Sequence, residues 1–356
     1  MRILILLLIS LFSILSYSQP EKELRQREKS IRKFLNKSDF ALIPEAHYRI
    51  NYNDQDVPFL RKSKTDSVNI DSFFMCKNEL SNFEYMEFIN YLVGIGDTNK
   101  IKDMMPDTTV WRDRYAHNEV YVDYYLRHPA YYEYPVIGLS FRKALAYAEW
   151  RTKFYNLNTE RQFKKVIFRL PTEKEWHHAA QGGSYDRIFP WEQVGAFDEE
   201  GKHLGNFRYA DQGSIYRDSL LSINYRGDTV RKLYYVQGSK GYSPMSIANN
   251  KGRLNDNHDI LSPKSTFEEN GYGLFNMAGN VEEMVFAEDC DRESFFYNFT
   301  KEPCDSVPED RSGITRGGSW KDPGAYARVD SRQYYSGQDY CSSEMGVRLV
   351  MEVISY

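Results

Sequence analysis

The sequence is poor in cysteine, in long apolar runs and in excess charge of either sign. Only one stretch, at the N-terminus, is apolar enough to enter a bilayer, which excludes a polytopic membrane protein. The 46 basic and 50 acidic residues give a net charge of −4, which argues against a nucleic-acid-binding protein. The 4 Cys and 7 His form no Cys-x-x-Cys, His-Glu-x-x-His or His-x-His motif. The common zinc-site patterns are therefore absent.

Aromatic residues, by contrast, are abundant. The 28 Tyr, 21 Phe and 5 Trp make up 15% of the 356 residues, which argues against disorder and indicates a large buried core. This length is sufficient for one large domain or two ordinary ones. No internal repeat or second domain boundary is visible.

The N-terminus has the pattern of a secretory signal. Arg2 precedes the apolar run Ile3 to Leu15, and Ser16 and Ser18 provide the small residues of a cleavage site. We expect residues 1–18 to be removed and the protein to be exported, to the periplasm or to an outer-membrane-associated location. An uncleaved anchor is the alternative. No cysteine lies at the junction, so we expect neither a lipid nor a direct membrane anchor.

Export makes disulfide bonds chemically available. Cys290 and Cys304 are 14 residues apart among acidic and turn residues, and we expect them to form a local disulfide. Cys76 and Cys341 could pair with each other or remain as two free thiols.

Several segments of the chain have the residue patterns of helices or of helix ends. Residues 19–38 are highly charged with sparse apolar positions, which indicates an exposed helix or tether. Ser81 and Ser140 are each suited to cap an amphipathic helix that follows. Thr172 and Glu175 have the spacing of a capping box, and Gly182 can end the helix that they begin.

A long polar region extends from Trp191 to about residue 268 and contains an insertion at about 213–255. Loops of this length are functional or mobile. Three further motif-like stretches follow it: NGYGLFNMAGNVEEM (270–284), TRGGSW (315–320) and GVRLV (346–350).

Together with ELSNFEYMEF (79–88), YPVIGLSF (134–141) and RLPTEKEWHHAAQGG (169–183), these stretches resemble the formylglycine-generating enzyme (sulfatase-modifying factor) family. The resemblance implies one domain over residues 39–356. It also implies an α+β fold, a variant of the C-type-lectin-like architecture with much irregular backbone and structural calcium.

The resemblance also implies two calcium sites. One would use the side chains of Asn276 and Glu283 with the backbone carbonyls of Gly279 and Val281. Hard oxygen donors around one carboxylate are the ligands that calcium prefers. The second would use the residues Asn206, Phe207, Asp256 and His258. The alternative is that these side chains only cap turns.

Active members of the family carry two cysteines shortly after the RGGS motif, where their thiolates bind copper(I). Asp322 and Ala327 stand at those two positions here. A carboxylate and a methyl group cannot replace a soft dithiolate site, so we expect no copper and no copper-dependent oxidation.

The run YYLRHPAYYEYPVIGLSF (124–141) and the long insertions resemble a branch of the family found in the gliding-motility and type 9 secretion machinery of Bacteroidetes. This resemblance implies a non-catalytic, calcium-binding partner of other envelope proteins, among them a ring- or complex-forming secretion component. The Tyr-rich segment 115–134 is a candidate contact surface, unless its rings pack within the fold. Two other functions remain open: an enzyme with another constellation, such as Asp322 with His177 or His178, and a calcium-dependent glycan-binding protein.

Overall fold

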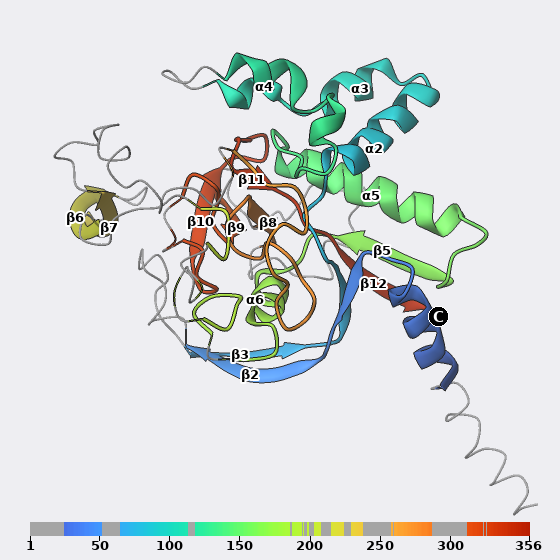
Figure 1. The fold of residues 1–356 in the computed structure, drawn as a ribbon, viewed down its shortest axis with the longest axis horizontal. Helices are drawn as coiled ribbons and strands as arrows, with labels where there is room; N and C mark the ends of the chain where they lie inside the picture. The colour runs from blue at the N-terminus through green and yellow to red at the C-terminus, as the bar shows by residue number, and fades with distance from the viewer. Residues whose placement is uncertain are drawn as a thin grey trace, which may run out of the picture.

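The computed structural model describes residues 25–51, 65–112, 118–185, 187–193, 195, 198, 203–207, 215–223, 229–237, 258, 260–286, 312–322, 324 and 326–356. Two four-stranded sheets, two two-stranded hairpins and a set of helices make up this part of the chain, joined by much irregular backbone (Figure 1). Helices and strands are mixed without a βαβ alternation, so the α+β class is confirmed.

The first sheet is antiparallel throughout and brings the two ends of the domain together. Its strands, in spatial order, are β1 (Phe40–Ile43), β4 (Phe73–Cys76), β12 (Val350–Ser355) and β5 (Lys165–Arg169). Because β12 lies between β4 and β5, the C-terminal strand closes the sheet on segments that are distant from it in sequence.

The second sheet carries the motif-rich C-terminal part. Its order is β10 (Arg332–Ser336), β9 (Ser312–Arg316), β8 (Glu282–Val285) and β11 (Met345–Gly346), with only the β8–β11 pair parallel. Two hairpins complete the strands: β2 (Ala46–Asn51) with β3 (Thr65–Ile70), and β6 (Ile215–Ile223) with β7 (Thr229–Gln237). The β6–β7 hairpin lies within the expected insertion.

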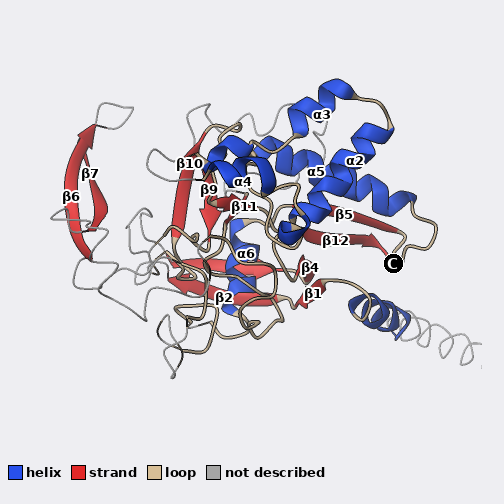
Figure 2. Cartoon of the chain, turned by 45° about the horizontal axis from the view of Figure 1, so that its top comes forward, coloured by secondary structure: helices blue, strands red, loops and turns tan. Residues whose placement is uncertain are grey.

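Most helices gather on one side of the first sheet (Figure 2). They are α2 (Asn82–Gly94), α3 (Thr98–Met104), η1 (Thr108–Trp111), α4 (Glu119–Tyr124), η2 (Pro129–Tyr131) and α5 (Phe141–Leu157). Helix α6 (Glu173–Gln181) lies apart from this group and contacts β3 of the first hairpin and β9 of the second sheet. It therefore lies at the centre of the molecule (Figure 1).

The predicted helix starts are confirmed by their caps. Ser81 and Thr172 each complete a capping box, with Glu84 and Glu175 respectively, and the Ser140 hydroxyl accepts from the amide of Lys143. Gly182 ends α6 with φ +57°, a conformation that glycine adopts without a steric cost.

The charged N-terminal segment forms a helix over residues 25–35, and this helix is docked rather than exposed. Phe34 is buried in the main core, and its ring lies 5.0 Å from Phe163 and 5.3 Å from Phe74. Ile31 and Leu35 pack against the same core. The sparse apolar positions of this segment, which suggested a solvated helix, are therefore enough to fix one face on the domain.

Within the described residues no helix is long and apolar enough to cross a membrane. The predicted signal, residues 1–18, lies outside the described residues.

Candidate functional site

The loop before β8 is built from backbone conformations that few residue types tolerate. Asn276 and Asn280 have φ values of +53° and +61°, and Gly279 has +76°. A Cβ atom at Gly279 would lie 2.2 Å from the carbonyl oxygen of Asn206. This loop and the segment around Asn206, which the sequence assigns to two separate calcium sites, are therefore in direct contact.

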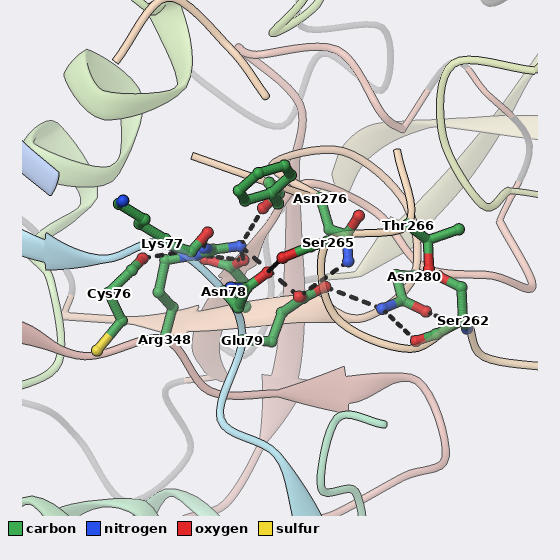
Figure 3. Close-up of polar contacts among 12 residues, drawn as sticks. Cys76, Lys77, Asn78, Glu79, Ser262, Ser265, Thr266, Asn276, Asn280 and Arg348 are labelled. Atoms are coloured by element: carbon green, nitrogen blue, oxygen red, sulfur yellow. Dashed lines mark hydrogen bonds and ion pairs between the residues drawn. The ribbon is translucent and has the colours of Figure 1, made fainter. Parts of the chain in front are cut away.

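Behind this loop lies a group of buried polar side chains that we call the buried charge cluster: Glu79, Asn276, Asn280, Glu283 and Arg348. The Glu79 carboxylate accepts from the Asn276 amide at 3.1 Å and from the Asn280 amide at 3.0 Å (Figure 3). The guanidinium of Arg348 lies 2.7 Å from Glu283 and 4.0 Å from Glu79. One cation thus lies between two carboxylates.

Other contacts hold both sides of the cluster in place. The indole of Trp176 donates to the second oxygen of Glu283 at 2.7 Å. Arg348 also donates to the backbone carbonyls of Cys76, Lys77 and Phe275 (Figure 3). The cluster therefore joins β4, α6, the loop before β8 and the C-terminal segment.

The electrostatics of the cluster leave room for a further cation. Burial, opposed by the charge of Arg348 and assisted by that of Glu283, raises the pKa of Glu79 to about 7. When Glu79 and Glu283 are both ionised, the cluster has a net charge of −1, because Arg348 supplies a single positive charge. A cation placed among these oxygens would balance that charge.

Two observations test the first predicted calcium site. The side-chain oxygen of Asn276 is buried and accepts no hydrogen bond from the part of the chain that the structure describes, and such an orphaned acceptor is costly unless it meets a donor or a cation. Glu283 provides a carboxylate, although Arg348 and Trp176 already contact both of its oxygens. Among the described residues no three His, Cys, Asp or Glu side chains converge, so a metal would depend on amide and carbonyl oxygens. The residues present fit calcium, a hard cation.

The second predicted site is only partly within the described residues. The Asn206 amide nitrogen donates to the carbonyl oxygen of Ile260 at 2.8 Å, and Phe207 is buried in an apolar cluster. His258 lies beside the ring of Phe267, with ring centroids 6.1 Å apart. Asp256 lies outside the described residues. The structure thus places Asn206 beside the first site, and this second set stays a prediction.

Asp322 and Ala327, the two positions where the family resemblance leads us to expect copper-binding cysteines, form what we call the substituted pair. The Asp322 carboxylate accepts from the Ser319 amide at 2.9 Å, from the Ser319 hydroxyl at 2.7 Å and from Gln333 at 3.1 Å. Ala327 is 2% exposed, and its methyl group packs with Phe189, Phe207 and Ala278. One position is therefore held by hydrogen bonds and the other by apolar packing.

Asp322 lies near another buried carboxyl group, that of Glu282. Burial raises the pKa of Asp322 above its ordinary value. Burial also raises the pKa of Glu282 to about 8, and the charge of Asp322 contributes to this shift. Glu282 accepts a hydrogen bond from the Thr315 hydroxyl at 2.6 Å. This is a region of hard oxygen groups, which a soft copper(I) ion does not favour.

The two cysteines that the structure describes make contacts with other groups than the substituted pair. Cys76 and Cys341 are both free, which resolves the alternative that the sequence left open. Burial raises the pKa of the Cys76 thiol to about 12, and Cys341 lies beside Asp107, with its sulfur 4.0 Å from a carboxylate oxygen. Cys290 and Cys304, the expected disulfide, lie outside the described residues.

A histidine–carboxylate pair does occur, but with a different partner from the one that the sequence suggested. His177 is 2.5 Å from Asp330, and its other ring nitrogen is 3.2 Å from the hydroxyl of Tyr48. His178 instead contacts the carbonyl oxygen of Pro44 at 3.0 Å. These contacts lend no support to the pairing of Asp322 with either histidine, because Ser319 and Gln333 hold that carboxylate, and the pairing stays a hypothesis.

Sequence reasoning missed Glu79, Asp330 and Arg348 as site residues. Glu79 and Arg348 lie within the ELSN and GVRL motifs, which were recognised as blocks but not assigned a role. The contact between them could not be found from spacing, because 269 positions separate the two residues. Asp330 stands in no recognised motif.

Comparison with solved structures extends the fold assignment. The chain superimposes on PvdO from Pseudomonas aeruginosa with a TM-score of 0.51 and 16% identity, covering 88% of this chain and 94% of that one. The Treponema denticola variable protein 1 gives a TM-score of 0.50 and 16% identity, covering 87% of this chain and 94% of that one. At this identity the two matches show a shared fold alone.

Curated relatives include both active and inactive proteins. The formylglycine-generating enzyme of Bos taurus is 24% identical over 261 residues, 67% of this chain and 55% of the relative. The inactive C-alpha-formylglycine-generating enzyme 2 of Bos taurus is 26% identical over 156 residues, 44% of this chain and 34% of the relative. The chain thus spans about half the length, or less, of these curated relatives. Residues 38–353 match the sulfatase-modifying factor enzyme 1-like domain family, and the chain belongs to this family.

Proposed function

We propose that this protein is an exported, non-catalytic calcium-binding module that acts through contacts with other envelope proteins. The observation that carries the proposal is the substituted pair. Asp322 is held by three hydrogen bonds, and Ala327 places a methyl group among aromatic rings. The reaction of the active relatives needs two thiolates at these positions, so the scaffold is used for something other than that oxidation.

Calcium would be held at the loop before β8. Asn276 offers its orphaned side-chain oxygen, Glu283 its carboxylate, and Gly279 and Val281 their backbone carbonyls. Calcium there would neutralise the excess negative charge of the buried charge cluster and fix the loop. Its role is structural, and no chemical step depends on it.

The contact surface of this proposal includes only some of the tyrosines in segment 115–134. Tyr121, Tyr125, Tyr131 and Tyr134 pack around Trp111 in an aromatic cluster, so they support the fold. Tyr124 and Val120 are about half exposed and stand four residues apart on α4. Tyr132 and Phe83, also exposed, contact each other with ring centroids 5.9 Å apart.

These four exposed side chains, Phe83, Val120, Tyr124 and Tyr132, form the contact surface of this proposal. Exposed aromatic rings are typical of interface centres, because they bury a large area at a small entropic cost. The partner is another envelope protein, and the resemblance favours a ring-forming component of the type 9 secretion or gliding-motility machinery.

Two experiments test the proposal. The purified protein receives copper(I), oxygen and a cysteine peptide of the sulfatase type, and mass spectrometry follows the peptide. We expect the cysteine to remain unchanged, and formylglycine in the product would refute a non-catalytic role.

The second experiment is a pull-down from envelope extract. We expect Tyr124→Ser with Tyr132→Ser to lose the partners that the wild type recovers. Tyr340→Ser, exposed elsewhere on the molecule, should recover them and serves as the control. Equal recovery by all three proteins would rule out this surface.

A second candidate function is an enzyme that uses Tyr48, His177 and Asp330. His177 and Asp330 are both buried, and the histidine bridges the carboxylate to the Tyr48 hydroxyl. A carboxylate that orients an imidazole, which in turn contacts a hydroxyl, is an arrangement that moves protons in many enzymes. A metabolite-mixture turnover screen that compares wild type with Asp330→Asn tests it. Turnover lost in the variant would favour this candidate, and no turnover in either protein would count against it.

A further inference from the structure

The docked N-terminal helix presents a strongly basic outer surface. Arg25, Lys29, Arg32 and Lys33 follow the helical spacing 0, 4, 7 and 8, so they share one side of the helix. Phe34 stands on the opposite side and is buried in the core. All four basic residues are exposed.

A second element extends this surface. The ring of Phe34 lies 5.0 Å from the ring of Phe163, and Phe163 is followed directly by Lys164 and Lys165, both exposed. The ring of Phe163 in turn lies 5.4 Å from that of Tyr356, over which the Arg27 guanidinium sits at 4.3 Å. The helix and the turn before β5 are thus packed through shared aromatic contacts, and they lie at the same end of the molecule in both views (Figures 1 and 2).

We call this surface the basic face: Arg25, Lys29, Arg32, Lys33, Lys164 and Lys165. Residues 25–37 contain six basic and one acidic residue, and residues 160–165 contain three basic and one acidic, a net of +5 and +2. Since the whole chain carries −4, the remainder carries −4 − 7 = −11. Positive charge is therefore concentrated on one end of an otherwise acidic protein, which favours binding of a polyanion there.

Exposed apolar side chains stand at the end of α5, which is joined to the strand that carries Lys165: the Asn156 side chain is hydrogen-bonded to both backbone groups of Val166. Leu157, the last residue of α5, is 81% exposed, and Phe154 is 52% exposed one turn earlier. The turn that follows leads directly to Phe163 and the two lysines. A phosphate backbone offers no apolar layer to such side chains, whereas a lipid bilayer offers anionic headgroups and acyl chains together.

We propose that the basic face, with Phe154 and Leu157 beside it, is a peripheral binding surface for an anionic lipid bilayer. The lysines and arginines contact lipid phosphates, and the two apolar side chains enter the boundary between headgroups and acyl chains. The contact needs no covalent lipid and orients the protein with its helix 25–35 against the membrane.

The test is flotation of the exported protein with vesicles of phosphatidylcholine alone or with 30% phosphatidylglycerol, at 0.1 M and 0.5 M salt. We expect binding to the anionic vesicles only, weakened at the higher salt because screening shortens the reach of the charges. Each basic residue near such a surface strengthens binding on the order of fivefold. The variant Lys29→Glu, Arg32→Glu, Lys33→Glu should therefore lose binding on the order of a hundredfold or more.

The matched control is Lys102→Glu, Arg112→Glu, Arg127→Glu, which reverses three exposed charges outside the basic face and should float like the wild type. Circular dichroism checks that both variants are folded. Leu157→Gln with Phe154→Gln should reduce the binding that survives at 0.5 M salt. Equal binding to neutral vesicles, equal loss in the control, or preference for a single-stranded oligonucleotide over anionic vesicles would each overturn the proposal.

Discussion

The buried charge cluster and the substituted pair differ in how their polar groups are satisfied. In the cluster both side chains named by the family resemblance, Asn276 and Glu283, carry oxygen atoms, and the buried side-chain oxygen of Asn276 accepts no hydrogen bond from the described residues. In the substituted pair Asp322 is saturated with hydrogen bonds and Ala327 is packed with apolar groups. The cluster is therefore suited to a ligand, whereas the pair is suited only to holding its own loops.

This difference shows that the residues that hold the fold together and the residues at the expected copper site make separate sets of contacts. Arg348, Glu79 and Glu283 connect strands and loops across the domain, so their loss would affect folding whether or not the protein is an enzyme. Asp322 and Ala327, by contrast, make local contacts with Ser319 and Gln333 and with a small apolar cluster. Four predictions test this contrast, from the largest expected effect to the smallest.

Arg348→Met should destabilise the protein most. It removes the cation between Glu79 and Glu283 and leaves two buried carboxylates facing each other, which typically costs about 3–5 kcal/mol. Urea unfolding measures the change. Arg142→Met, which breaks ion pairs with the exposed Asp103 and Asp339, should cost about 1 kcal/mol or less. Equal losses in the two variants would show that the buried charge cluster has no special role.

Calcium removal should come next. If the calcium concentration is about 100 times the dissociation constant, binding adds about 2.7 kcal/mol to the native state, and EDTA should lower the melting temperature accordingly. Asn276→Gly keeps the left-handed backbone of that residue and removes its amide, so it should melt at the same temperature with and without EDTA.

Ser265→Gly, at another left-handed position, is the control and should respond to EDTA like the wild type. A wild type that does not respond to chelation would contradict the calcium proposal.

Ala327→Leu should destabilise the protein by about 2 kcal/mol, because the larger side chain must enter a space filled by Phe189, Phe207 and Ala278. The exposed Ala130→Leu should change the free energy of unfolding by less than about 0.5 kcal/mol. If Ala327→Leu is tolerated as well as the control, the second thiol position is an open pocket and the packing argument fails.

Asp322→Asn should have the smallest effect, visible as a change with pH. Burial raises the pKa of Asp322 in the folded state, so the native protein holds this proton more tightly than the unfolded chain. Its contribution to stability is full below the unfolded pKa of about 4 and is lost as the pH rises through the folded value. Between pH 4 and 7 the wild type should therefore lose stability relative to Asp322→Asn, as measured by urea unfolding. Parallel pH curves would show that this carboxyl is not perturbed.

The sequence predicted local features well, because caps and turns depend on residues close together in the chain. Ser81, Ser140, Thr172 and Gly182 begin or end helices where their side chains or conformations require it. The family motifs also led to the correct domain family over nearly the whole chain.

Features that depend on distant contacts could not be predicted. The pairing of Arg348 with Glu79 joins the two ends of the domain, and no local pattern reveals it. The contact between His177 and Asp330 joins residues 153 positions apart, and no spacing in the sequence points to it. The sequence could not show which rings of the Tyr-rich segment are packed and which are exposed, because its apolar residues follow neither a helical nor a strand periodicity.

Metal content tests the contrast between the two regions most directly. The protein is dialysed against calcium and copper(I) under reducing, oxygen-free conditions, freed of unbound ions and analysed by elemental mass spectrometry. The account predicts at least one calcium per chain, lost in Asn276→Gly, and no bound copper. Stoichiometric copper bound in place of calcium would contradict it.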